Sequence, residues 1–225
     1  MSKINLDGDD PRAVRLANEY LRAERALRAH GVRHTILVMA STRASRADPY
    51  YEVAREFGAR VARDGRAVLM TGGGPGIMAA ANRGAADAGG LSIGLNIRLP
   101  RPQRPNRWLT PRLGMSFRYF ALRKLHFLLR ARAFVAFPGG FGTFDELFET
   151  LTLAQTRKIA PLPIVLVGRA YWRRVVDFDY LARAGMIRRR DLRLFRYADS
   201  AEEIWRAVSK ALPTRARAAR GRARS

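Results

Sequence analysis

The chain has 225 residues, 48% of them hydrophobic, a length that suits one large α/β domain better than two full domains. It has no cysteine, which excludes disulfides and thiolate metal sites, and its three histidines are too scattered to predict a metal site. The first residues lack the apolar segment of a signal peptide, and no apolar run approaches the roughly 20 residues of a membrane span. We therefore expect a cytoplasmic protein with no membrane partner.

The formal net charge is +23, from 42 Lys and Arg against 19 Asp and Glu. A charge of this size attracts polyanions such as DNA, RNA or an anionic membrane surface. Only four of the 42 basic residues are lysine, however, and arginine with scarce lysine is what GC-rich coding produces. No nucleic-acid-binding motif accompanies the charge, so a nucleic-acid partner is the weaker alternative and a phosphorylated substrate the stronger one.

Hydrophobic periodicity predicts a helix over residues 11–30, which Gly31 ends. Short apolar runs then alternate with segments of helical spacing. The predicted strands are residues 35–40, 67–71, 91–97, 133–137 and 163–167. The predicted helices are residues 49–63, 77–88, 117–130, 143–157, 170–184 and 201–212, the last preceded by a capping box of Ser200 and Glu203.

Continuously apolar strands that are each separated by a helix indicate a parallel sheet covered on both faces. We therefore predict a single-domain α/β protein with a Rossmann-like, doubly wound parallel sheet in three α/β/α layers. Residues 1–31 form an N-terminal helical extension and residues 32–212 the nucleotide-binding catalytic domain in this prediction. The proline-rich residues 98–111 are expected to form a surface loop, and the Arg-rich residues 213–225 a disordered tail.

Two glycine clusters stand where a predicted strand leads into a helix, which is where open α/β sheets bind ligands. They are residues 72–78 (GGGPGIM) and residues 138–146 (PGGFGTFDE). The first cluster matches neither the dinucleotide fingerprint nor a P-loop, so a plain tight turn is an alternative. In the second, Thr143 and Glu146 match a T-x-x-E capping box, which would give Glu146 a structural role only. A cap needs no glycine, whereas an anion bound on the loop accounts for three of them.

Between these clusters, Arg118, Arg123 and Lys124 interrupt an apolar and aromatic segment, residues 115–130. These basic residues either form a solvated face or are partly buried. A buried arginine needs an anionic partner, for which Glu146 and a substrate phosphate are the candidates.

Together, residues 72–78, Asn82-Arg83-Gly84, Arg123-Lys124 and residues 138–146 resemble the LOG (Lonely Guy) family, long described as "possible lysine decarboxylase", and its longer bacterial branch in particular. The resemblance covers about residues 35–167 and extends weakly to residue 212. It implies hydrolysis of the N-glycosidic bond of a cytokinin riboside 5′-monophosphate or of a purine nucleotide such as AMP, which releases free base and ribose 5-phosphate. It also implies a homodimer or higher homo-oligomer with the site near the interface, and we expect no metal or other cofactor.

Carried over to this chain, the resemblance makes Arg123 and Glu146 the catalytic pair. Glu146 would stabilise the positive charge that develops on the ribose and activate water, while Arg123 would keep it ionised. The expected substrate and phosphate contacts are Ser41, Arg43, Gly73, Gly74, Gly76, Met115, Lys124, Gly139, Gly140, Phe141, Gly142, Thr143 and Thr152. Trp108, Phe117 and Tyr119 are candidates for contacts with the base. The alternatives are a non-catalytic nucleotide sensor or carrier that uses the same pocket, and a nucleic-acid-binding protein.

Overall fold

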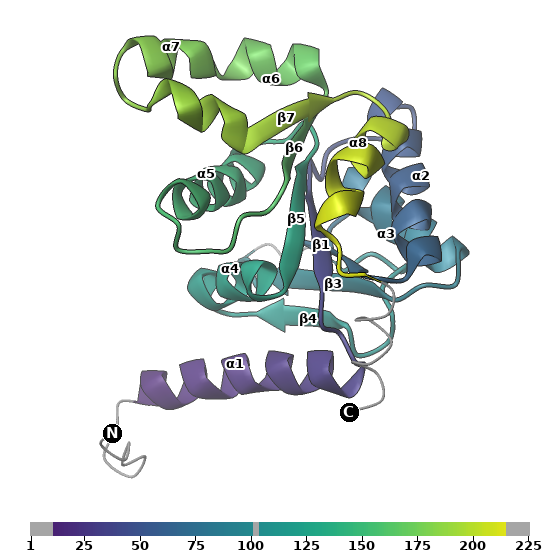
Figure 1. The fold of residues 1–225 in the computed structure, drawn as a ribbon. Helices are drawn as coiled ribbons and strands as arrows, with labels where there is room; N and C mark the ends of the chain where they lie inside the picture. The colour runs from purple at the N-terminus through teal and green to yellow at the C-terminus, as the bar shows by residue number, and fades with distance from the viewer. Residues whose placement is uncertain (1–10, 101–103, 215–225) are drawn as a thin grey trace.

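A computed structural model describes residues 11–100 and 104–214 of the chain. These residues form one seven-stranded sheet with the strand order β4-β3-β2-β1-β5-β6-β7, in which every neighbouring pair is parallel (Figure 1). The strands are β1 (Thr35–Met39), β2 (Val68–Thr71), β3 (Ser92–Ile97), β4 (Gly114–Phe117), β5 (Ala131–Ala136), β6 (Ile164–Val167) and β7 (Phe195–Ala198). The strand order reverses direction beside β1, as in a doubly wound sheet.

Helices cover both faces of the sheet (Figure 1). They are α1 (Pro11–Ala29), α2 (Pro49–Asp64), α3 (Ile77–Asp87), α4 (Phe120–Leu129), α5 (Phe141–Gln155), α6 (Arg169–Val175), α7 (Phe178–Arg183) and α8 (Ala201–Val208), with 3-10 turns at Arg189–Leu194 and Ser209–Ala211. One apolar core lies under α2, α3 and α8, and a second lies under α1, α4 and α5. The predicted three-layer Rossmann-like fold is therefore confirmed. Among the described helices, none is long and apolar enough to cross a membrane.

The structure adds two strands that the sequence reading missed, and both lie at the edges of the sheet. The helix predicted over residues 117–130 begins only at Phe120, and Phe117 belongs to β4 instead. The helix predicted over residues 170–184 is broken into α6 and α7, because Asp177 caps the second helix by accepting a hydrogen bond from the Tyr180 amide (2.7 Å). Residues 215–225 of the predicted tail lie outside the described residues.

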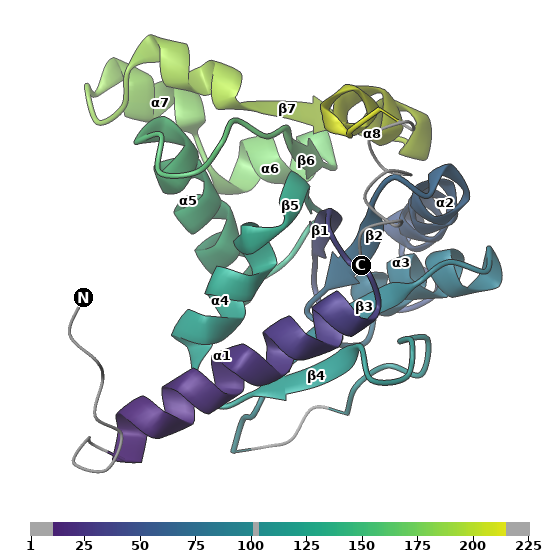
Figure 2. The same ribbon diagram turned by 60° about the horizontal axis from the view of Figure 1, so that its bottom comes forward.

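The first helix, α1, is attached to both ends of α4 (Figure 2). At the start of α4, a carboxylate oxygen of Glu19 accepts hydrogen bonds from the backbone amides of Arg118 (2.6 Å) and Tyr119 (3.3 Å). At its end, Arg130 donates two hydrogen bonds to the buried carboxylate of Glu24 (2.6 and 2.9 Å). Because unpaired amides at a helix start favour an acceptor, and a buried carboxylate favours a paired cation, both contacts stabilise α4.

Candidate active site

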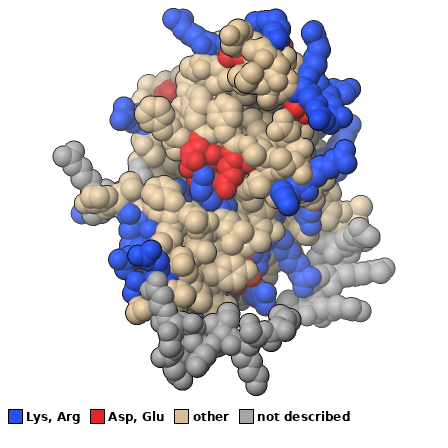
Figure 3. Space-filling view, turned by 90° about the vertical axis from the view of Figure 1, so that its left-hand side faces the viewer, with Lys and Arg blue, Asp and Glu red and all other residues tan. Residues whose placement is uncertain are grey.

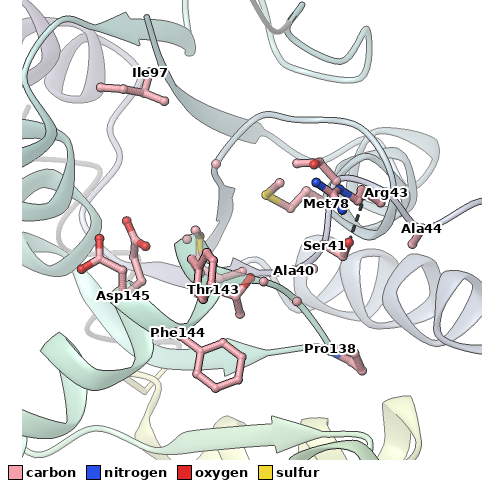
Figure 4. Close-up of a pocket in the computed structure, with 18 of the residues that line it drawn as sticks. Ala40, Ser41, Arg43, Ala44, Met78, Ile97, Pro138, Thr143, Phe144 and Asp145 are labelled. Atoms are coloured by element: carbon pink, nitrogen blue, oxygen red, sulfur yellow. Dashed lines mark hydrogen bonds between the residues drawn. The ribbon is translucent and has the colours of Figure 1, made fainter. Parts of the chain in front are cut away.

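A cavity of about 1000 Å³ lies at the carboxyl ends of the central strands. Its walls come from the loops after β1, β2 and β5, from the end of β3 and from the helices α4, α5 and α6. Ser41, Arg43 and Met78 lie on one side of the cavity and Asp145 on the other, with Thr143 between them (Figure 4). A cavity in this position is where a doubly wound sheet binds its ligand.

Glu146 lies in α5, one turn after the glycine-rich loop, and lines this cavity. Its side chain is buried, with 4% exposure, and its Oε1 atom has no hydrogen-bond partner among the described residues. Burial raises the pKa of Glu146 from 4.5 to about 7, while the nearby Arg123 acts in the opposite direction. Arg123 thus favours the ionised form of Glu146, as expected, but the raised pKa shows that desolvation has the larger effect.

Arg123 lines the same cavity from α4, and contacts with Leu95 and Phe127 fix its side chain. Its Nε donates a hydrogen bond to the Leu95 carbonyl oxygen (2.7 Å), and its guanidinium carbon lies 4.9 Å from the centre of the Phe127 ring. Burial lowers the pKa of Arg123 and Glu146 raises it, but an arginine remains charged under such conditions. Of the ion pairs among the described residues, none joins Arg123 to Glu146, so the Nη atoms of Arg123 are not committed to that carboxylate.

The first glycine cluster makes room for Arg123. A Cβ atom added to Gly72 would lie 2.7 Å from Nη2 of Arg123, so a larger residue would displace the guanidinium. The next residue, Gly73, has φ +73° and packs against the buried Asn96, whose Oδ1 would lie 2.2 Å from an added Cβ. Gly72 lines the cavity, whereas Gly73, Gly74 and Gly76 do not. Gly72 therefore leaves space for the arginine, and the expected substrate contacts of the last three glycines stay a prediction.

The second glycine cluster has an open face. A Cβ atom added at Gly140 or Gly142 would meet no atom within 4 Å, and Gly140 is the N-cap of α5 without any side-chain cap. The first amides of a helix have no acceptor within the helix, so the amides of Phe141 and Gly142 are available to an anion. Gly139, in contrast, packs closely against the Thr143 hydroxyl. The loop thus presents donors to the cavity.

The predicted capping box at this loop is wrong. Helix α5 begins at Phe141, so Thr143 and Glu146 lie inside the helix and neither side chain caps it. The helix begins at Phe141, two residues before the start at Thr143 that the capping-box pattern predicts. As a result, Glu146 lies in the second turn and faces the cavity.

Two contacts connect this loop to its surroundings. The Tyr171 hydroxyl, from α6, donates a hydrogen bond to the Gly139 carbonyl oxygen. The Ser41 amide, from the loop after β1, donates to the Pro138 carbonyl oxygen (3.0 Å). Sequence reasoning did not find Tyr171, because it lies 32 residues away in a helix with no motif of its own.

The other predicted contacts are divided. Ser41, Arg43, Gly139, Gly140, Phe141, Gly142 and Thr143 line the cavity, whereas Met115, Lys124 and Thr152 do not. Met115 is buried in the core, and Thr152 lines a separate surface hollow with Phe148 and Glu149. Trp108, Phe117 and Tyr119 do not line the cavity either; its apolar wall includes Met39, Met78, Ile97, Leu99 and Phe120.

Lys124 belongs to the outer face of α4 and α5. Its ammonium group pairs with Asp145 (2.7 Å) and with Glu149 (3.1 Å). Acidic side chains gather around a basic group near the middle of this face (Figure 3). Because its charge is balanced there, Lys124 is not positioned to act on a ligand in the cavity.

A parallel doubly wound sheet, with a glycine-rich loop and a buried carboxylate at a cavity by the carboxyl ends of its strands, defines a Rossmann-like protein with a candidate ligand site there. Residues 78–208, more than half of the chain, match the sequence profile of the family described as "Possible lysine decarboxylase". The chain belongs to this family, which includes the LOG proteins.

Among curated relatives, the cytokinin riboside 5′-monophosphate phosphoribohydrolase LOG of Oryza sativa subsp. japonica is 30% identical over 122 residues, which cover 53% of this chain and 49% of the relative. The corresponding LOG3 protein of Arabidopsis thaliana is 26% identical over 189 residues, which cover 82% of this chain and 86% of the relative. The chain spans about half the length of the first curated relatives that it matches.

Among solved structures, the molybdenum cofactor carrier protein of Chlamydomonas reinhardtii superposes with a TM-score of 0.57 at 24% identity, covering 80% of this chain and 98% of the carrier. The molybdenum cofactor binding protein of Rippkaea orientalis gives a TM-score of 0.54 at 20% identity, covering 79% of this chain and 96% of that protein. At this identity, the two structures share the fold with this chain.

Proposed function

We propose that the chain is a nucleoside 5′-monophosphate phosphoribohydrolase, which hydrolyses the N-glycosidic bond of its substrate to free base and ribose 5-phosphate. The observation that carries the proposal is the buried carboxyl group of Glu146, which has an unpartnered oxygen and a pKa of about 7 and faces the cavity beside the glycine loop. A strongly perturbed carboxyl group in a cavity is typical of a catalytic acid or base. The names of the LOG relatives support the reaction class.

In this proposal the loop of residues 138–143 binds the 5′-phosphate. The open faces of Gly140 and Gly142 let the phosphate approach the backbone, and the amides that begin α5 donate to its oxygens. Arg43, across the cavity, adds a positive charge. Since Glu146 follows this loop by one helical turn, a bound phosphate sets the ribose close to the carboxylate. Binding energy from the phosphate thereby positions the bond that breaks.

The chemistry assigned to Glu146 is that of a general base and an electrostatic stabiliser. As the bond between ribose C1′ and the base nitrogen breaks, its electron pair leaves with the base and positive charge develops on the ribose. The ionised Glu146 stabilises this charge and accepts a proton from the water that attacks C1′. The departing base takes up a proton from solvent, and Glu146 later releases its own proton to solvent. A pKa near 7 keeps both protonation states accessible at neutral pH. The free Nη atoms of Arg123 orient the carboxylate or a ribose hydroxyl.

The base is proposed to lie on the apolar wall formed by Met39, Met78, Ile97, Leu99 and Phe120. This wall suits a purine with or without an apolar substituent, so both AMP and cytokinin riboside monophosphates are candidate substrates. A lysine decarboxylase reaction has less support, because the ion-paired Lys124 does not line the cavity.

A homodimer with the site near its interface is also part of the proposal. Large apolar side chains are exposed on α4 and at the mouth of the cavity, including Leu125, Leu129 and Phe141, the last with 96% of its surface exposed. Exposed apolar side chains grouped in this way are typical of protein interfaces. Light scattering coupled to size-exclusion chromatography will give the mass, and a monomer at all concentrations would contradict this part of the proposal.

The direct test is to incubate the purified protein with AMP and with isopentenyladenosine monophosphate, and to detect the released base by chromatography. We expect Glu146→Gln to lower turnover by about 10² or more, since a general base typically contributes that much. Glu149→Gln is the matched control, because Glu149 lies on the same helix but pairs with Lys124 outside the cavity, and it is expected to retain activity. Undiminished turnover by Glu146→Gln would contradict the assigned role. Tight nucleotide binding without base release would instead indicate a non-catalytic nucleotide-binding protein.

A further inference from the structure

A further hollow, of about 270 Å³, lies where α1 meets the main domain. Four of its seven lining residues are arginines, and the others are Asn18, Glu19 and Tyr119. The arginines come from three separate segments: Arg15 and Arg22 from α1, Arg98 from the end of β3, and Arg118 from the turn between β4 and α4. Figure 2 shows α1 running alongside β4, which brings these segments together. We refer to this site as the arginine hollow.

The positive charge of the arginine hollow is not balanced by the described residues. No ion pair among them involves Arg15, Arg22, Arg98 or Arg118. The one acidic side chain in the hollow, Glu19, already accepts two backbone amide hydrogen bonds at the start of α4. All four arginine side chains are exposed, so an anion from solution can reach them.

Most N–H donors of the four guanidinium groups make no hydrogen bond to a described residue and are available to a ligand. Arg22 donates to the Ser116 carbonyl oxygen (2.5 Å), and Arg15 makes a long contact with the Tyr119 hydroxyl (3.4 Å). Each uses only one of its five N–H donors in these contacts. The Arg98 and Arg118 side chains donate no hydrogen bond to any described residue, and Arg118 lies 5.9 Å from the Tyr119 ring centre. Several uncommitted planar donors that face one small space match the oxygens of a phosphate group.

We propose that the arginine hollow is a second anion site, distinct from the glycine loop, which binds a phosphate group. The hollow is smaller than the pockets that enclose whole nucleotides, which indicates inorganic phosphate or the phosphate of a small monoester. A bidentate dianion offsets the charge of four arginines and one glutamate better than a monovalent anion does.

The position of this site connects it to the candidate active site. Arg98 lies between Ile97 and Leu99, which both line the active-site cavity, and Arg118 precedes Phe120, which lines it from α4. Side chains alternate between the two sides of an extended segment. An anion bound by Arg98 would therefore contact the side of this segment that faces away from the active-site cavity. Phosphate binding therefore stabilises one wall of the cavity as well as the contact between α1 and α4.

Isothermal titration calorimetry with inorganic phosphate, at fixed pH and ionic strength, tests this proposal. The titrations are made on a Gly142→Asp variant, because a carboxylate at the open start of α5 repels phosphate from the glycine loop. We expect this variant to bind one phosphate per chain. Adding Arg98→Gln and Arg118→Gln should weaken that binding about tenfold or more, since charge-assisted hydrogen bonds are lost.

The matched control adds Arg174→Gln and Arg190→Gln, which remove the same charge from exposed positions outside the hollow. We expect its affinity to stay within about twofold of the Gly142→Asp variant, because distant exposed charges are screened. Circular dichroism melting will confirm that all variants are folded. A titration with ribose 5-phosphate in the same variants distinguishes a monoester from inorganic phosphate. No phosphate binding by Gly142→Asp, or an equal loss in the control, would overturn the proposal.

Discussion

Burial of the Glu146 carboxyl group, which the proposed function requires, should make the stability of the chain depend on pH. The pKa of Glu146 rises from 4.5 to about 7 on folding, because burial disfavours the charged carboxylate. Between these two pH values the folded chain keeps a proton that the unfolded chain has released, so the free energy of unfolding falls as pH rises through this interval. The full loss, present above about pH 7, corresponds to about 3 kcal/mol.

Glu146→Gln removes this loss, since glutamine is neutral at every pH and similar in size. We expect the variant to be more stable than the natural chain by about 3 kcal/mol at pH 8, and by less than about 1 kcal/mol at pH 5. Such a gain would accompany the loss of turnover, as is common when a residue is kept for function.

Urea denaturation followed by circular dichroism at pH 5 and pH 8 gives both free energies of unfolding. Glu149→Gln is the control, because Glu149 is partly exposed and pairs with Lys124, so its replacement should change stability by less than about 1 kcal/mol at either pH. The reasoning would be refuted if Glu146→Gln were no more stable than the natural chain at pH 8, or if its gain were the same at both pH values.

Other changes test neighbouring parts of the site. If Glu146 acts as the base, kcat/KM for base release should rise with pH and level off above about 7, and a flat profile across this range would contradict it. Gly72→Ala should displace the Arg123 guanidinium, destabilise the chain by about 1–3 kcal/mol and lower kcat, as denaturation and steady-state kinetics will measure. Tyr171→Phe, which removes the hydrogen bond to the glycine loop, should raise KM severalfold with little change in kcat; an unchanged KM would show that the loop does not depend on it. Glu24→Gln should cost about 3 kcal/mol in urea denaturation, because it leaves Arg130 partly buried without its carboxylate.

The sequence predicted the central strands well and the edges poorly, for a physical reason. Strands β1, β5 and β6 are covered on both faces, so they appear as continuous apolar runs. The edge strand β7 reads Phe-Arg-Tyr-Ala, with Arg196 exposed, and has no such run. The four residues of β4 lie between a proline-rich segment and an aromatic one. Neither a polar–apolar alternation nor a long apolar run therefore distinguishes this strand from the start of a helix.

In the candidate site, the sequence motifs grouped residues that the structure also brings together, but they did not predict every role. Spacing and resemblance grouped Arg123, Glu146 and the second glycine cluster, and the structure brings them to one cavity. The sequence could not predict that Gly72 leaves space for the guanidinium of Arg123. That contact joins residues 51 positions apart in the chain and exists only in the folded structure. The pKa of Glu146 also depends on packing, which no local pattern reports.

The attachment of α1 at two points has a consequence for what counts as the working unit of this chain. A shortened chain that began at Val32 would retain every family motif, including both glycine clusters and the Arg-Lys pair. It would nevertheless lose the acceptor of the amides before α4 and the partner of Arg130 after it, and so expose an unpaired guanidinium on the helix that carries Arg123. The motifs alone therefore do not delimit the part of the sequence that is needed to hold the arginine in place.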